Sequence, residues 1–210
     1  MSKNVAYYVD NGQVHSKTID FAHSTKDNIS KKKAIQAMNR KLKEIDDRDV
    51  KHLDINIRNP NELARALAPY QISLGEYKVE SLYHSSKLFE GGGPYQELAS
   101  MPVGKVLNDP RLKDSGEVID FYYKGQYWGM DRVFFYDFLF VKAAKESIDN
   151  EKLKQLLDYD YFTDIESKRT AERNPARSVA IIKLMLMMFG EIPELNKKDF
   201  VAFCKAFVKA

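Results

Sequence analysis

The alternation of hydrophobic and polar residues predicts a small antiparallel sheet at the start of the chain. Its three strands are predicted over residues 5–9, 14–21 and 51–57. Asp10-Asn11-Gly12 separates the first two strands, and this sequence favours the tight turn of a β-hairpin. Between the second and third strands, apolar residues recur at helical spacing over residues 31–45, after Ser30 as a suitable helix cap.

From residue 59 onward, the apolar residues mostly recur at helical spacing. Asn59-Pro60 predicts a helix start, because asparagine caps a helix and proline fits its first turn. Further helices are predicted over residues 79–89, 132–145, 150–158, 175–189 and 197–208. A strand at 118–123 turns at Lys124-Gly125 toward a shorter one, and residues 168–173 are predicted as a mobile polar loop. We therefore expect an α+β fold in which helices dominate.

Length and composition favour one globular domain. With 210 residues, of which 44% are hydrophobic and 30% charged, the chain can form a sizeable core. We expect residues 1–57 to pack as N-terminal strands and a helix on a core formed by residues 58–210, with no linker between them. The net charge of +3 is too small to identify a nucleic-acid-binding protein, and it does not oppose one.

Nothing in the sequence indicates secretion or a membrane anchor. The start, Met1-Ser2-Lys3-Asn4, lacks the features of a signal peptide. The most apolar run, Val179–Phe189, is interrupted by Lys183 and is too short to span a bilayer. Cys204 is the only cysteine, so no internal disulfide can form, and its apolar helical surroundings predict a buried thiol. These features predict a cytoplasmic protein.

One stretch, Val79–Pro94, concentrates side chains that can carry chemistry. On a helix, Glu80, His84 and Lys87 lie within roughly 60° on one face. The following Gly91-Gly92-Gly93-Pro94 predicts the end of that helix. The arrangement indicates one wall of a polar cleft. The alternative is a solvated stripe whose charge pair contributes only about 0.2–0.5 kcal/mol.

The stretch from Val79 to Tyr95 resembles the signature helix of the NADAR (YbiA-like) family. In that helix, a glutamate precedes an aromatic pair, a glutamine and a Lys-aliphatic-Phe ending at the same offsets; His84 stands here in place of the glutamine. The Gly-Gly-Pro-Tyr ending is similar to the branch of the family that is paired with toxins that ADP-ribosylate guanine in DNA. Further motifs resemble that branch in the same order: Asp109–Lys113, Ile119–Trp128, Phe135–Leu139 and Tyr161–Glu166.

The resemblance implies a YbiA-like fold with an ADP-ribose pocket. Tyr70 and Gln71 are implied as adenine or phosphate contacts, although this segment differs from the family's usual one and simple packing of Tyr70 stays open. Asp164 is implied to order the ribose or a water molecule, and His84 is implied to contact the substrate. Trp128 is implied as a stacking surface for a base, with core packing as its alternative role.

The glycine-rich turn adds a candidate phosphate site. Arg111 is a cation near that turn, and Gly92 lets the backbone approach a ligand closely. A pyrophosphate needs such cations or free backbone N–H groups. The alternative is an exposed loop whose basic residues bind nothing.

The residue types exclude several classes of catalysis. The chain has no Cys/His cluster at zinc spacing, no Gly-x-Ser-x-Gly and no Walker loop, so we expect neither a metal nor a cofactor. Cleavage of an N-glycosidic bond needs a proton donor for the leaving nitrogen and negative charge near the anomeric carbon. Glu80 is predicted to be that acid/base. Lys87 is predicted to attack the anomeric carbon or to stabilise developing charge.

The leading hypothesis is an ADP-ribosyl glycohydrolase that removes ADP-ribose from guanine in DNA. Its partners are then ADP-ribosylated DNA and, functionally, a DNA ADP-ribosyltransferase toxin, with no membrane involved. It acts as a bacterial antitoxin or as a phage counter-defence protein. Two alternatives stay open: a non-catalytic protein that binds ADP-ribose or the toxin, and an N-glycosidase of a small ribosylamino-pyrimidine nucleotide.

Overall fold

The N-terminal hairpin forms as its sequence predicts. In the computed structural model, which describes residues 2–21, 28–46, 48–165 and 173–209, β1 (Ser2–Asp10) pairs antiparallel with β2 (Gln13–Phe21). The two residues of the turn, Asn11 and Gly12, have φ angles of 48° and 71°. Positive φ at both positions gives a two-residue turn the twist that the flanking strands need.

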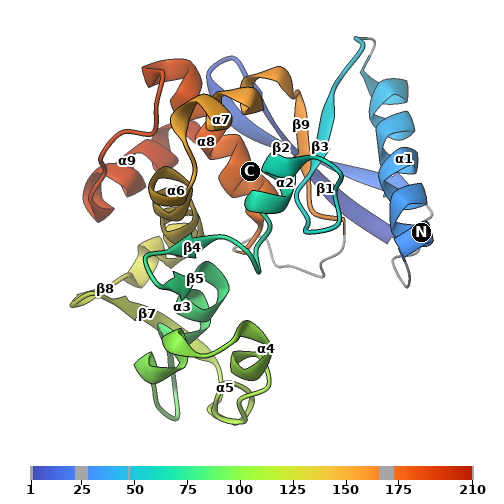
Figure 1. The fold of residues 1–210 in the computed structure, drawn as a ribbon. Helices are drawn as coiled ribbons and strands as arrows, with labels where there is room; N and C mark the ends of the chain where they lie inside the picture. The colour runs from blue at the N-terminus through green and yellow to red at the C-terminus, as the bar shows by residue number, and fades with distance from the viewer. Residues whose placement is uncertain (1, 22–27, 47, 166–172, 210) are drawn as a thin grey trace.

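The sheet around this hairpin is mixed rather than purely antiparallel. Its strand order is β2-β1-β9-β3 (Figure 1). β9 (Tyr161–Thr163) runs antiparallel to β1, and β3 (His52–Asp54), shorter than its predicted strand, runs parallel to β9. Residues 1–57 therefore share their sheet with a strand from far along the chain.

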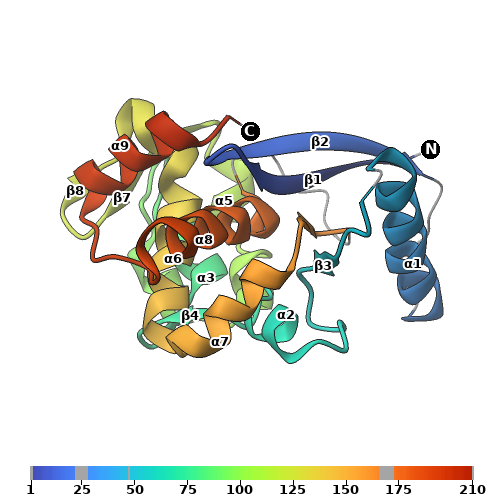
Figure 2. The ribbon, with the colours of Figure 1, turned by 90° about the horizontal axis from the view of Figure 1, so that it is seen from above.

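A helix covers each face of this sheet. α1 (Asn28–Ile45) packs on one face through Met38 and Leu42, and α8 (Pro175–Phe189) lies against β1 and β9 on the other (Figure 2). α1 begins before Ser30, so this serine lies inside the helix and the predicted cap is wrong. α8 has the predicted ends, since the Asn174 side chain accepts a hydrogen bond from the Ala176 N–H and Gly190 follows with a φ of 76°.

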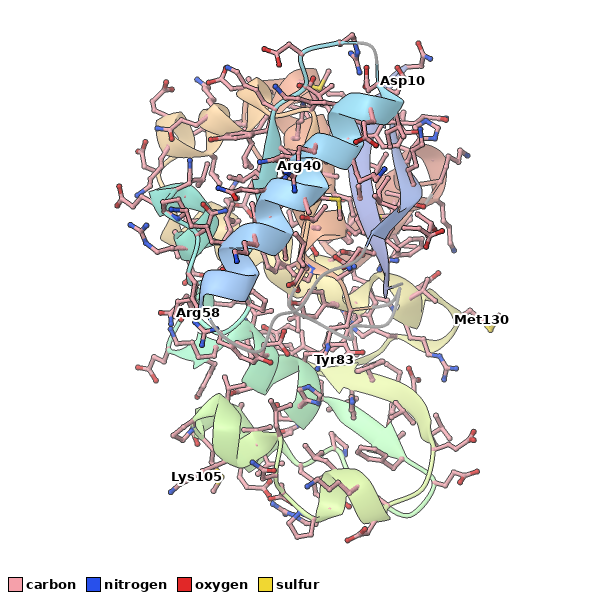
Figure 3. The ribbon with its side chains drawn as sticks, turned by 90° about the vertical axis from the view of Figure 1, so that its right-hand side faces the viewer. Asp10, Arg40, Arg58, Tyr83, Lys105 and Met130 are labelled. Carbon is pink, nitrogen blue, oxygen red and sulfur yellow. The ribbon has the colours of Figure 1, made fainter. Side chains whose placement is uncertain are left out.

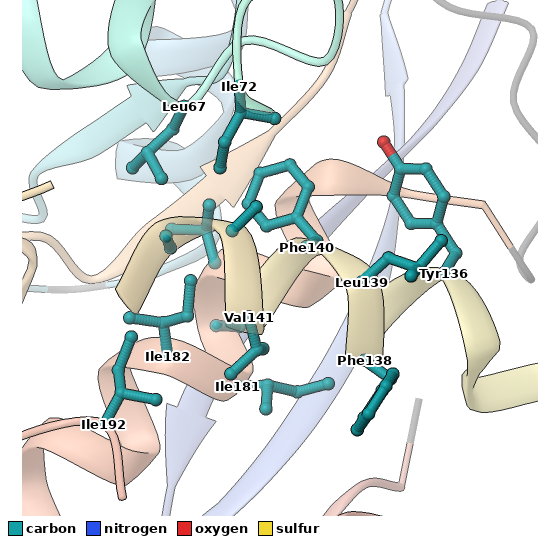
Figure 4. Close-up of a cluster of buried hydrophobic side chains, with 14 of the residues drawn as sticks. Leu67, Ile72, Tyr136, Phe138, Leu139, Phe140, Val141, Ile181, Ile182 and Ile192 are labelled. Carbon is teal, nitrogen blue, oxygen red and sulfur yellow. The ribbon is translucent and has the colours of Figure 1, made fainter. Parts of the chain in front are cut away.

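The main core forms around α6 (Phe135–Ser147), which packs against α8. Figure 4 shows Phe140, Val141 and Ile182 within it, with Leu67 and Ile72 covering the far side. The residues that precede α6 form a 3₁₀ helix, η2 (Gly129–Phe134), instead of the start of the predicted α-helix. Cys204 is buried in this core, as predicted.

The remaining elements of this part of the molecule are short. They are α2 (Glu62–Ala66), β4 (Ser73–Leu74), β5 (Tyr77–Lys78), α7 (Asn150–Lys154), η3 (Gln155–Asp158) and α9 (Lys197–Phe207). Asp149 and Asn196 directly precede the predicted helices 150–158 and 197–208, and their side chains cap α7 and α9 by accepting hydrogen bonds from the first turns. Asn61, not Asn59, caps α2.

A second group of elements follows α2 and forms the lower part of Figure 1. It contains α3 (Val79–Ser85), β6 (Lys87–Phe89), η1 (Gln96–Ser100), α4 (Val103–Val106), α5 (Arg111–Asp114), β7 (Val118–Tyr123) and β8 (Gln126–Tyr127). α3 contacts α6, and the same hydrophobic core continues from α6 into α3 and β7. The fold is thus an α+β single domain. Over the described ranges, no helix is both long and apolar enough to cross a membrane.

Candidate active site

α3 is buried along its whole length, and it carries Glu80 and His84. Its neighbours are α6, η1, α4 and β5. Glu80 and His84 lie one turn apart, and neither is exposed by more than 7%. Because a buried charge is costly unless it is compensated, the partners of Glu80 define this site.

Lys87 does not belong to α3, so the predicted two-turn spacing of Glu80 and Lys87 on one helix is wrong. The helix ends at Ser85, and Lys87 is the first residue of β6, opposite Phe121 of β7. The side chains of Ser85 and Ser86 both donate hydrogen bonds to the Leu82 carbonyl, at 3.1 and 2.7 Å. Such local bonds compete with helix continuation, and pairing with β7 satisfies the backbone that follows.

The Glu80 carboxylate accepts hydrogen bonds from two other helical regions. The Tyr136 hydroxyl of α6 donates to Oε1 at 3.0 Å, and Nη1 of Arg173, just before α8, lies 3.4 Å from Oε2. The Glu80 side chain is fully buried, whereas the Arg173 side chain is 21% exposed. Arg173 therefore brings a positive charge from the rim of the site to a carboxylate that water does not reach.

His84 completes this arrangement as a neutral side chain. Its Nε2 lies 2.6 Å from Nη1 of Arg173. Since arginine only donates, Nε2 must offer a lone pair, and the imidazole proton then resides on Nδ1. The 3.8 Å approach of His84 Nε2 to Glu80 Oε2 is consequently no ion pair, whereas Arg173 brings a positive charge to Glu80.

Tyr83 connects Lys87 to this cluster. The Lys87 Nζ lies 5.3 Å from the centroid of the Tyr83 ring, a distance at which a cation is attracted to an aromatic face. The same ring meets the His84 and Tyr136 rings edge-on, each with a centroid distance of 5.3 Å. Figure 3 shows Tyr83 at the level where the part that contains α1 meets the part that contains α4 and α5.

The glycine-rich turn holds the backbone of Lys87 rather than ending a helix. Gly93 has a φ of 89°, and a Cβ atom there would lie 2.7 Å from the Lys87 carbonyl oxygen. Gly92 has a φ of 150°, a backbone conformation that residues other than glycine rarely adopt. Only glycine fits these two positions, so the turn packs directly on the start of β6.

Comparison with protein families decides where this chain belongs. Residues 3–210 match the sequence model of the family described as the DarT1-associated NADAR antitoxins. The chain belongs to this family. Its association with a DarT1 toxin and its antitoxin role follow from that membership, and no curated protein matches the chain.

In this NADAR antitoxin, neighbouring side chains bind Arg111, and its role as a phosphate contact stays a prediction. Its guanidinium binds Asp109 and Glu97 at 3.0 and 2.6 Å and stacks on Tyr95, 4.6 Å from the ring centroid. Two carboxylates thus compensate its charge, and the resulting contacts hold Tyr95 against the glycine-rich turn. The hydroxyl of Tyr95 also lies 2.8 Å from the Ser115 Oγ.

Three other predicted ligand contacts of the antitoxin lie outside α3. Trp128 is 2% exposed and packs between Phe135 and Phe138, which corresponds to the core role rather than base stacking. Tyr70 and Gln71 are exposed on the segment between α2 and β4. The roles of these two residues as ligand contacts stay predictions.

Asp164 lies at the carboxyl end of β9, where β3 also ends. β3 and β9 are parallel, with Asp54 opposite Thr163, so the residues that follow both strands meet at one edge of the sheet. Asp164 is buried and lies near the buried Asp54 carboxyl. Glu166, the last residue of the motif, and residues 167–172 of the predicted loop lie outside the described residues.

Two contributors to the antitoxin's site were missed by the sequence analysis. Arg173 was assigned to a polar loop, although its position before the Asn174 cap fixes where the guanidinium points. Tyr136 was assigned to an apolar helix face, although a buried tyrosine hydroxyl requires a polar partner. That requirement was the available signal, since the motif Phe135–Leu139 places an acid and a tyrosine in an otherwise apolar helix.

Over the part of the chain that the structure describes, no group of His, Cys, Asp and Glu side chains has the arrangement of a metal site. The site in this family member is built instead from a carboxylate, a guanidinium, an imidazole, a phenol and an amine. Together these groups can fix an anionic carboxylate and supply an amine close to aromatic faces.

Proposed function

We propose that this NADAR antitoxin is an ADP-ribosyl glycohydrolase that cleaves the N-glycosidic bond between ADP-ribose and guanine in DNA. It thereby reverses the modification made by a DarT1 toxin. The observation that carries the proposal is the fully buried Glu80, held by Tyr136 and Arg173, beside the cluster of Tyr83 and Lys87. Family membership supports the same biological role.

Glu80 provides the negative charge that this reaction needs. Departure of guanine leaves positive character on the anomeric carbon of ribose, and a fixed carboxylate stabilises that charge. The hydrogen bonds from Tyr136 and Arg173 orient both carboxylate oxygens before the substrate binds. Preorganisation of this kind costs no rearrangement during the reaction, because the surroundings are already in place.

Lys87 provides an amine. In its neutral form, the Lys87 amine attacks C1 of the ribose, the bond from C1 to guanine breaks, and the guanine amine takes one proton from the attacking nitrogen. The C1–O4′ bond then opens, O4′ takes the second proton, and an imine between Lys87 and C1 results. Water then adds to this imine and releases free ADP-ribose and the original amine. In the other form of the proposal, Lys87 stays protonated and only stabilises developing charge, and the experiment below separates the two forms.

The test uses an oligonucleotide that carries ADP-ribose on a guanine amine, with free ADP-ribose as the readout. Glu80→Gln keeps the size of the side chain and an oxygen for Tyr136, and Lys87→Arg keeps the positive charge without a nucleophilic amine. Exposed Lys105 gives a matched control, Lys105→Arg. We expect a fall of at least about 100-fold for the first two variants, as for loss of a key transition-state group, and no change for the control.

Borohydride trapping decides the role of Lys87. Reduction of an imine fixes the ribose to the protein, so a mass increase in wild type that Lys87→Arg lacks supports the covalent route. If wild type forms no adduct and Lys87→Arg keeps full activity, the result supports charge stabilisation by a protonated Lys87. If wild type releases no ADP-ribose and yet protects cells from the toxin, the glycohydrolase proposal is wrong and a binding antitoxin remains.

A further inference from the structure

A chain of hydrogen bonds, partly buried at its α1 end, links α1 to the edge of the sheet. The Asn39 Oδ1 of α1 lies 2.6 Å from Nδ1 of His52, and Nε2 of His52 lies 2.6 Å from the Thr163 Oγ1. The Thr163 Oγ1 lies 2.6 Å from Oδ1 of Asp54. Thr163 and Asp54 are 0% and 1% exposed, so water does not replace the hydrogen bond between these two side chains.

Counting hydrogens shows that this chain has two possible directions. Its three contacts need three hydrogens, but a neutral His52 supplies one and Thr163 supplies one. The third hydrogen must come from the residue at one end of the chain, which is either Asp54 or Asn39. Either Asp54 is protonated and every donor points toward Asn39, or Asp54 is ionised and the Asn39 amide is turned so that its Nδ2 donates to His52. His52 carries its proton on Nδ1 in the first state and on Nε2 in the second.

The surroundings bring these two states close in free energy. Burial raises the pKa of Asp54 to about 7, with a smaller effect from the negative charge of Asp164, although hydrogen bonds from Thr163, Ile165 and Asn56 oppose the rise. Burial lowers the pKa of His52 to about 3, so this ring stays neutral while Asp54 titrates. Among the residues that the structure describes, the titratable groups that face Asp54 are thus His52 on β3 and Asp164 after β9, whereas α1 and the segment after β3 contribute the neutral Asn39 and Asn56.

We propose that Asn39, His52, Thr163 and Asp54 form a proton-coupled switch, in which the titration of Asp54 exchanges the tautomer of His52. Asp54 is a positioning residue for Asp164, because its Oδ1 also accepts the Ile165 N–H at 3.0 Å. While Asp54 is neutral, it adds no negative charge beside Asp164. Once ionised, it repels Asp164 and binds the Ile165 N–H more strongly. The link to Asp164 rests on the proposed function; the switch itself does not.

The primary test is the nitrogen chemical shifts of His52 in the full chain labelled with ¹⁵N-histidine, followed from pH 5.5 to 8.5. The signals are assigned by their loss in His52→Gln. We expect the Nδ1–H tautomer at low pH, the Nε2–H tautomer at high pH, and a midpoint near pH 7. A single tautomer over the whole range, or an imidazolium at low pH, overturns the switch.

Two substitutions at one position provide the matched comparison. Thr163→Ser keeps the hydroxyl and is expected to keep the exchange, whereas Thr163→Val replaces the hydroxyl by a methyl group and is expected to abolish it. Circular dichroism checks that each variant is folded. If Thr163→Val still exchanges with the wild-type midpoint, Thr163 does not couple the two groups and the proposal fails. The wild-type titration decides the switch even if a variant does not fold.

The rate of ADP-ribose release against pH tests the positioning role. We expect an inflection near pH 7 in wild type and Thr163→Ser that Asp54→Asn lacks, because the charge that acts on Asp164 is that of Asp54. If the wild-type rate shows no such inflection although the His52 tautomer exchanges clearly, Asp54 is not a positioning residue for Asp164. The proposed switch is then still supported. If wild type releases no ADP-ribose at all, the proposed function fails, and the nitrogen shifts still decide the switch.

Discussion

Two buried carboxyl groups in this molecule are accommodated by opposite means. Glu80 meets the guanidinium of Arg173, together with the Tyr136 hydroxyl. Among the residues that the structure describes, Asp54 has hydrogen-bond contacts with the neutral groups of Thr163, Ile165 and Asn56, and its titratable neighbours His52 and Asp164 bring no positive charge. One acid is therefore stabilised by a cation, and the other is stabilised by keeping its proton up to about neutral pH.

The difference shows that burial alone does not assign a chemical role to an acid. A carboxylate beside a fixed cation stays anionic and suits the stabilisation of positive charge. A carboxyl group among neutral donors becomes a site that takes up and releases a proton near pH 7. The first environment fits the reacting centre of a glycosidase, and the second fits a residue that sets the charge of its surroundings.

We expect the largest effect on stability when the positive charge of Arg173 is removed from Glu80. Arg173→Met leaves the Glu80 carboxylate buried without its cation, and we expect the free energy of unfolding to fall by about 3–5 kcal/mol. Chemical denaturation measures this change. Arg173→Met combined with Glu80→Gln is expected to recover most of it, because a neutral amide needs no cation.

An exposed arginine is the control for this effect. Arg48 pairs with Asp46 at 2.8 Å, but the Arg48 side chain is 72% exposed. We expect Arg48→Met to cost no more than about 1 kcal/mol. Equal losses at Arg48 and Arg173, or no recovery in the double variant, would show that Arg173 acts through packing and not through the Glu80 charge.

A second prediction concerns pH and Asp54. The folded-state pKa of about 7 exceeds the ordinary value, so folding favours the protonated acid. Its stabilisation is complete below the unfolded pKa of about 3.9 and is lost as pH rises through about 7, with a slope of up to about 1.4 kcal/mol per pH unit. Comparing the free energies of unfolding of wild type and Asp54→Asn at pH 5, 6 and 7 isolates this slope, since the other titratable groups are common to both. A difference that does not change with pH would contradict the neutral Asp54.

We expect the smallest effect on stability when the hydrogen bond from Tyr136 to Glu80 is removed. Tyr136→Phe removes a hydrogen bond to a charged acceptor, and we expect a loss of about 1.5–3 kcal/mol in unfolding free energy. Tyr159→Phe is the matched control, because the Tyr159 hydroxyl binds the neutral amide of Asn61 at 2.8 Å and is expected to cost only about 1 kcal/mol. If the two variants lose the same amount, Tyr136 does not bind an ionised Glu80.

The sequence predicted those features that depend on near neighbours. The hairpin turn at Asn11 and Gly12 and the caps Asp149, Asn174 and Asn196 follow from local rules, and the structure confirms them. The presence of Glu80 and His84 on one helix was also predictable from spacing.

Features that depend on distant partners were not predictable. The end of α3 before Lys87 requires β7, whose residues come more than thirty positions later. The contact of Arg173 with Glu80 joins residues 93 positions apart, and the contact of Thr163 with Asp54 joins residues 109 positions apart. Hydrophobic periodicity carries no information on such pairs, because it reports only which face of an element is buried.

The insertion of β9 between β1 and β3 also has a consequence for the order of folding. During synthesis, the hairpin and β3 leave the ribosome more than a hundred residues before Tyr161–Thr163, which pairs with both. The central sheet therefore cannot close until β9 has been synthesised, and long-range pairing of this kind is slow. We expect the edges of β1 and β3 to stay exposed in the nascent chain until β9 has left the ribosome.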